Sequence, residues 1–82
     1  MTQYLIMCRS LTHAQRSARL LERQGISAAV IKAPQELSWH GCAYAVSLHK
    51  RFDETVQLLR KNDMLTGKLY MRKSDKYIEV PT

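Results

Sequence analysis

The sequence predicts an α+β domain in which a four-stranded antiparallel sheet carries two helices on one face. Three observations indicate this class. Short apolar runs of strand length are separated by two longer segments whose apolar residues recur at helical spacing. The segments follow the order strand, helix, strand, strand, helix, strand. The 82 residues match the size of one domain, so we expect residues 1–82 to fold as a single unit.

A strand and a helix open the predicted domain. Residues 3–9 (QYLIMCR) contain a continuous apolar run, and Tyr and Ile favour a strand. Residues 10–25 (SLTHAQRSARLLERQG) predict a helix, because apolar residues recur on one face. These residues, at i, i+4 and i+7, are Ala14, Ala18 and Leu21. Thr12 and Gln15 have the spacing of a capping box at the helix start, and Gly25 favours its end.

Two further strands, separated by a loop, occupy the centre of the chain. Residues 26–32 (ISAAVIK) predict the second strand, which Pro34 stops. Residues 33–41 (APQELSWHG) are expected to form a loop. In residues 42–48 (CAYAVSL), bulky and small side chains alternate with a period of two, which is typical of a strand with one bulky face.

A second helix and a final extended segment complete the pattern. Residues 51–63 (RFDETVQLLRKND) predict the helix, since their apolar residues share one face. That face consists of Phe52, Val56 and Leu59. Residues 68–80 form either one long bent strand or a hairpin with residues 74–76 (SDK) as its turn. The whole order is the ferredoxin-like β-α-β-β-α-β arrangement, whose second sheet face must be wetted or covered by another subunit, as in a homodimer.

The chain carries a net charge of +6, and much of it lies in the C-terminal part. The basic residues there are Arg60, Lys61, Lys68, Arg72, Lys73 and Lys76. A surface of this sign attracts RNA, anionic cofactors or an acidic protein, although a solvated basic face without a dedicated partner explains the charge equally well. No aromatic-rich RNA-binding motif accompanies the charge, so nucleic-acid binding stays open without support from a motif.

Most enzymatic constellations are absent from the sequence. Its three glycines form no phosphate-binding loop, and its histidines and cysteines show neither His-x-x-x-His nor Cys-x-x-Cys spacing. We therefore expect no resident cofactor and no metal, and a hydrolase or a metalloenzyme is disfavoured. No apolar run approaches the roughly 20 residues that cross a bilayer, and no secretion leader is recognised. We expect a cytoplasmic protein with reduced cysteines and no membrane contact.

The residues suited to chemistry gather around Cys42, at the junction of the loop and the third strand. A cysteine acts as a nucleophile only as its thiolate, which positive charge or backbone amides stabilise. His40 lies two residues away, Ser38 offers a hydroxyl, and Gly41 relaxes the backbone just before the thiol. The alternative is that Cys42 packs as a small hydrophobe at the start of a strand.

Cys8, in the first strand, is expected to be a buried structural cysteine. It becomes a candidate resolving thiol for Cys42 only if the first and third strands lie side by side, as they do in a ferredoxin-like sheet. A thiol redox sensor with a reversible disulfide between the two cysteines is therefore one functional hypothesis.

The chain resembles the selenium/sulfur carrier protein-like family of small domains. The matching pieces are SLTHAQRSARLLERQGI at residues 10–26, APQELS at residues 33–38, and Cys42 with AYAV behind it. The resemblance extends from Tyr4 to Leu65. Two features depart from the family pattern: Ala43 rather than glycine follows the cysteine, and the interval from Ser38 to Cys42 is one residue longer.

The resemblance implies a carrier rather than an enzyme. Cys42 would accept sulfur or selenium as a persulfide or perselenide from a donor protein and deliver it to an acceptor enzyme, with His40, Ser38 and Gly41 supporting the thiol. The sequence leaves open which of the two elements is carried. The alternative from another class is a non-catalytic binding or regulatory module that uses the open sheet face or the basic surface to hold a protein, RNA or a small anion.

Overall fold

A computed structural model describes residues 2–40, 43–65 and 67–81. Within these ranges the chain is an α+β protein with two α-helices and a five-stranded antiparallel sheet, so the predicted class is confirmed. In chain order, the elements are β1 (Gln3–Cys8), α1 (Leu11–Arg23), β2 (Ala29–Lys32), the 3-10 helix η1 (Gln35–His40), β3 (Tyr44–Leu48), α2 (Phe52–Lys61), β4 (Leu69–Lys73) and β5 (Lys76–Val80).

The sheet has one strand more than the four predicted. Its order is β2-β3-β1-β4-β5, and every neighbouring pair is antiparallel. The extra strand arises because the final segment is a hairpin rather than one bent strand. Ser74 and Asp75 both adopt the left-handed conformation at its turn, with φ of 51° and 65°. Two consecutive positive φ values match the twist of the flanking strands, and a short polar side chain such as Asp tolerates them.

Helix α1 begins earlier than the capping-box spacing predicted. Its N-cap is Ser10, not Thr12, because the chain leaves β1 in an extended conformation at Ser10 and turns immediately into the helix. The Ser10 hydroxyl accepts a hydrogen bond from the His13 amide at 3.1 Å, which satisfies one free amide of the first turn.

Both α-helices end in the same left-handed turn. At the end of α1, Gly25 has a φ of 76°, and the amide of Ile26 donates to the Leu21 carbonyl at 2.9 Å. At the end of α2, Asp63 has a φ of 56°, and the amide of Met64 donates back to the last turn at 2.8 Å. Gly25 was predicted to end the first helix, and the structure confirms it.

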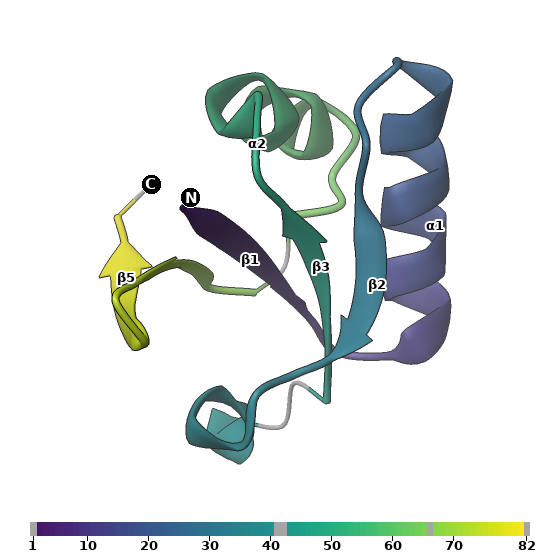
Figure 1. The fold of residues 1–82 in the computed structure, drawn as a ribbon. Coiled ribbons are helices and arrows are strands. Elements are labelled where there is room, and N and C mark those ends of the chain that lie inside the picture. The colour runs from purple at the N-terminus through teal and green to yellow at the C-terminus, as the bar shows by residue number, and fades with distance from the viewer. Residues whose placement is uncertain (1, 41–42, 66, 82) are drawn as a thin grey trace.

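The alternation of side chains along the strands divides the core between the two faces of the sheet. The helix side contains residues of both α-helices and of three strands: Ile6, Cys8, Ala14, Leu21, Ile26, Val46, Leu48, Val56, Leu59 and Leu69. Figure 1 shows α1 packed along this side of β2 and β3. On the same side, the Phe52 ring stacks on Tyr4 with centroids 4.3 Å apart, which joins the start of α2 to β1.

The second face of the sheet carries its own apolar cluster. Its buried members are Leu5, Met7, Leu37, Ala45 and Tyr70, and Tyr77 of β5 packs against them. Leu37 comes from η1, which lies on the side of the strands away from α1 (Figure 1). The segment predicted as a loop at residues 33–41 is therefore partly helical, and it covers part of the face that we expected to be open.

Gly67 lies so close to β1 that a side chain does not fit there. A Cβ atom at this position would lie 2.3 Å from the Met7 carbonyl oxygen, so the backbone would have to move. We expect Gly67→Ala to lower the free energy of unfolding by about 1–3 kcal/mol, as overpacking does. Urea denaturation should show a lower midpoint with an unchanged m value.

Gly25→Asn is the matched control for this prediction. Asn tolerates the left-handed conformation, and a Cβ at Gly25 would meet only the Arg51 guanidinium, at 3.8 Å. We expect it to cost less than Gly67→Ala. Equal midpoints for the two variants would contradict the proposed clash with β1.

Candidate functional site

The predicted thiol site lies between η1 and β3. Ser38 and His40 belong to η1, and the structure describes their backbone but not their side chains. Gly41 and Cys42 lie outside the described residues. The geometry around the site is therefore given by η1 before it and by Ala43 after it.

Both flanks of this segment are held against the sheet. The amide of Ala33 donates to the Ala43 carbonyl at 2.9 Å, which extends the pairing of β2 with β3 by one step. The amide of Leu37 donates to the Pro34 carbonyl at 2.9 Å and forms the first turn of η1. The Leu37 side chain is 7% exposed. The chain therefore enters and leaves the thiol site from anchored positions.

Sequence reasoning missed η1, although two signals for it were present. Pro34 favours the start of a helical turn, since it fixes φ and needs no hydrogen-bond donor there. Leu37 is a single large aliphatic residue in a polar segment, which is typical of one short turn packed on a core. A 3-10 helix of six residues shows too little periodicity to be distinguished from a loop.

Cys8 is buried, as predicted. Its side chain is 1% exposed in the helix-side core, and its Sγ donates to the Ile6 carbonyl at 3.5 Å. Because β1 pairs with β3, Cys8 lies opposite Tyr44, two residues after Cys42 in the chain. The two strands therefore lie side by side, which was the condition for a resolving role of Cys8.

His13 makes a long-range contact that the sequence did not indicate. It lies in the first turn of α1, and its Nε2 is 2.8 Å from the Met64 carbonyl oxygen. A carbonyl only accepts hydrogen bonds, so the ring nitrogen is the donor. The contact links the start of α1 to the segment that follows α2, 51 residues away.

Arg51 connects the C-terminal end of α1 to the start of α2. Its Nη1 donates to the Gly25 carbonyl at 3.0 Å, and its Nε donates to Glu54 Oε1 at 3.0 Å. The hydrogen bond from Arg51, helped by its charge, lowers the pKa of Glu54, so the stabilisation is present at neutral pH and is lost as the pH falls through that lowered pKa. Both side chains are exposed, so solvent weakens the pair.

The basic C-terminal part is less uniformly positive than its composition suggests. Lys68 pairs with Glu79 at 3.5 Å, and Arg72 pairs with Asp75 at 2.8 Å. The Arg72 guanidinium also lies 5.9 Å from the centroid of the Tyr77 ring. Two of the six basic residues named above are thus engaged within the chain.

Two other site classes were tested on the described part of the chain. Across residues 2–40, 43–65 and 67–81, no three His, Cys, Asp or Glu side chains are grouped so that they could hold a metal ion. Over the same ranges, no helix combines the length and the apolar character that crossing a membrane requires.

The comparison with known families identifies the chain. Residues 3–71 match the profile of the family described as "Putative Se/S carrier protein-like". The chain belongs to this family. The match to the carrier-like family begins with β1 and ends within β4, so it includes η1 and Cys42 but not β5. No curated protein and no solved structure matches the chain significantly.

The burial of Cys8 predicts that its thiol is protected in the native protein. In a Cys42→Ser variant, Cys8 is the one remaining cysteine, so its alkylation is measured without interference. After reduction, we expect iodoacetamide to modify Cys8 at least about a hundredfold more slowly in buffer than in denaturing urea, because reaction requires local or global unfolding. Intact mass spectrometry over time gives both rates. Similar rates in the two conditions would contradict the burial.

Proposed function

We propose that the protein is a cytoplasmic carrier that accepts sulfur or selenium on Cys42 and delivers it to an acceptor enzyme. The observation that carries the proposal is the family match over residues 3–71, which includes Cys42. In this role the protein binds a donor protein and an acceptor protein in turn. It transfers an atom between them and needs neither a metal nor a substrate pocket of its own.

The transfer step is a thiol exchange that needs no external oxidant. The Cys42 thiolate attacks the outer sulfur of a persulfide on the donor, the sulfur–sulfur bond of the donor breaks, and the donor cysteine leaves as a thiolate. Cys42 then carries the persulfide. Delivery is the reverse process, in which a nucleophile of the acceptor takes the outer sulfur and Cys42 leaves as a thiolate. A perselenide follows the same course.

The burial of Cys8 supports the assignment of this role to Cys42. The chain has two cysteines, and Cys8 is 1% exposed inside the helix-side core. A carrier thiol must reach the reactive sulfur of another protein, which a buried side chain does not do. The burial of Cys8 therefore favours Cys42 as the residue that carries out the exchange.

The anchoring of η1 is consistent with a role for Ser38, His40 and Gly41 in stabilising the Cys42 thiolate. Leu37 holds η1 on the sheet, which fixes the backbone of the short helix that contains Ser38 and His40. In the proposal, a protonated His40 and the Ser38 hydroxyl stabilise the Cys42 thiolate, and Gly41 allows backbone amides to approach the sulfur.

There is less reason to expect a homodimer than the open sheet face predicted from the sequence suggested. The second face of the sheet is partly covered within one chain, because Leu37 is buried there and Tyr77 packs beside it. Less apolar surface is then left for a second subunit to cover. We therefore propose the donor and the acceptor as the main partners.

A redox sensor remains the second candidate, and the pairing of β1 with β3 favours it. Cys8 lies opposite Tyr44, near in sequence to Cys42. Formation of a Cys8–Cys42 disulfide would transfer two electrons to an oxidant such as peroxide. Non-reducing peptide mapping after mild peroxide treatment tests this, and a linked peptide pair would favour the sensor over the carrier.

The carrier proposal predicts loading of one atom on Cys42. The reduced protein is incubated with a cysteine desulfurase and cysteine, or with a selenocysteine lyase and selenocysteine, and its intact mass is measured. We expect the mass of one added sulfur or selenium in the wild type and in Cys8→Ala, and none in Cys42→Ser. His40→Ala should load about threefold more slowly, because less of Cys42 is then thiolate, while the intrinsic nucleophilicity of a more basic thiolate offsets part of the loss.

A carrier of established competence is loaded in parallel as the positive control. Loss of loading in Cys8→Ala but not in Cys42→Ser would assign the carrier role to Cys8 and contradict the proposal. The carrier proposal would be contradicted if Cys42 gains no mass while both enzymes load the control carrier.

A further inference from the structure

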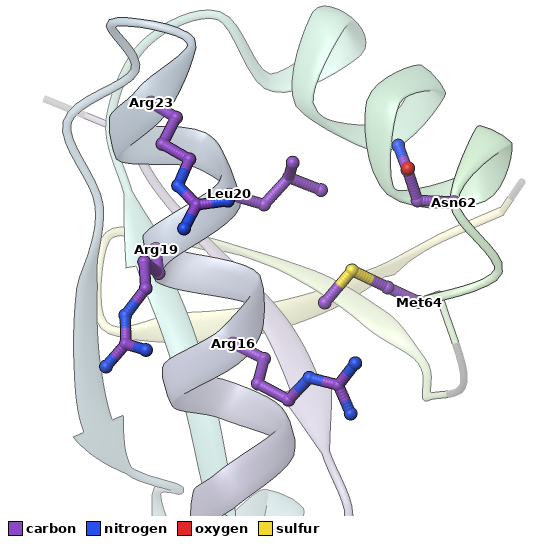
Figure 2. A pocket seen from close by; sticks show the side chains of 6 residues that line it. All are labelled: Arg16, Arg19, Leu20, Arg23, Asn62 and Met64. Carbon is purple, nitrogen blue, oxygen red and sulfur yellow. The ribbon is translucent and has the colours of Figure 1, made fainter.

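A groove with a volume of about 340 Å³ lies between α1 and the segment after α2. It is lined by Arg16, Arg19, Leu20, Arg23, Asn62 and Met64 (Figure 2). Figure 2 shows the side chains of Leu20 and Met64 pointing toward one another from the two walls. Arg16 and Arg23 of α1 flank them, while the Arg19 side chain points outward from the other side of the helix. The groove therefore combines an apolar floor with a cationic rim.

The positive charge of this rim is available to a partner. Arg16, Arg19 and Arg23 are exposed and follow one another at i, i+3 and i+7, which spans about 10 Å along the helix. Within the part of the chain that the structure describes, none of the three forms an ion pair. Arg23 lies in the last turn, where its positive charge interacts favourably with the helix dipole. The dipole does not explain the presence of Arg16 or Arg19, which lie further from the helix end.

The wall opposite α1 is held in place by hydrogen bonds. The Met64 amide donates to Leu59 at 2.8 Å, and the Met64 carbonyl accepts from His13 at 2.8 Å. The Asn62 side chain donates to the Leu58 carbonyl at 2.8 Å. A groove whose wall is already ordered loses little conformational entropy when a ligand binds.

The chemistry of the groove matches an acidic protein segment. The guanidinium group of arginine binds carboxylates with two parallel hydrogen bonds, which an ammonium group does not do. Arginine and methionine are enriched in protein–protein interfaces, and lysine, which does not line this groove, is depleted in them. RNA would also be attracted by the charge, but no aromatic side chain lines the groove to stack a base.

We propose that this groove docks an acidic segment of a partner protein, with an apolar side chain placed between carboxylates. The apolar side chain contacts Leu20 and Met64, and the carboxylates pair with the arginines of α1. The groove lies on the helix side of the sheet, whereas η1 packs on the other face. Docking here is thus a second activity that does not depend on the thiol chemistry.

The test compares two synthetic peptides of equal length and equal glutamate content. One carries leucines between the glutamates, and the other carries serines at the same positions. Binding is measured by fluorescence anisotropy at about 0.15 M salt, where long-range attraction is screened. The wild type should bind the leucine peptide more tightly than the serine peptide, because the leucines contact Leu20 and Met64. Charge attraction alone would not distinguish the two peptides.

Two triple variants separate the groove from the net charge. Arg16→Ala, Arg19→Ala and Arg23→Ala together remove the rim, while Lys32→Ala, Lys73→Ala and Lys76→Ala remove the same charge from exposed positions elsewhere. We expect the first to weaken binding of the leucine peptide about tenfold or more and the second less than about twofold. Alanine is the best helix former, so α1 is retained, which circular dichroism checks.

Several outcomes would overturn the proposal. These are no binding of either peptide by the wild type, equal affinity for the two peptides, or equal loss in the two triple variants. A single-stranded oligouridylate of the same charge is tested as well. If it binds more tightly than the leucine peptide, and if the Arg16, Arg19 and Arg23 variant loses this binding, the groove would be assigned to nucleic acid instead.

Discussion

The strand β1 must be covered on both of its faces, and the arrangement of the other elements follows from this requirement. Its last four residues, Leu5 to Cys8, are each no more than 2% exposed, and it lies between β3 and β4 in the sheet. A continuous apolar run is typical of a strand buried on both sides. The two α-helices cover Ile6 and Cys8, while η1 and Tyr70 cover Leu5 and Met7.

The same requirement positions the candidate thiol site. Leu37 packs in the cluster that contains Leu5 and Met7, so η1 is fixed to the sheet by the apolar surface of β1. Ser38 and His40 follow directly in the same short helix. A polar loop without Leu37 would leave part of the second face of β1 in water, and the segment that leads to Cys42 would lose an apolar anchor. The core and the proposed site therefore depend on one another.

Much of the fold was predictable because the relevant signals are local. The order of the elements, the end of α1 at Gly25 and the burial of Cys8 follow from periodicity and residue type. The hairpin was left open because its turn requires positive φ at Ser74 and Asp75, which non-glycine residues adopt only in a suitable context. The His13–Met64 contact joins positions 51 residues apart, and no local pattern predicts it. Residue type and family-like spacing single out Cys42 as a candidate, and its role stays a prediction.

A carrier must meet two partners in turn, which places opposing demands on its surface. Contacts that bind one partner too tightly would prevent release to the next. Exposed arginine–carboxylate pairs suit this requirement, because each contributes only about 0.2–1 kcal/mol and mainly speeds encounter. The groove of α1 offers three such arginines on the helix side of the sheet, away from η1. Recognition on one side and exchange on the other would let a docked partner leave the η1 side accessible to a second protein.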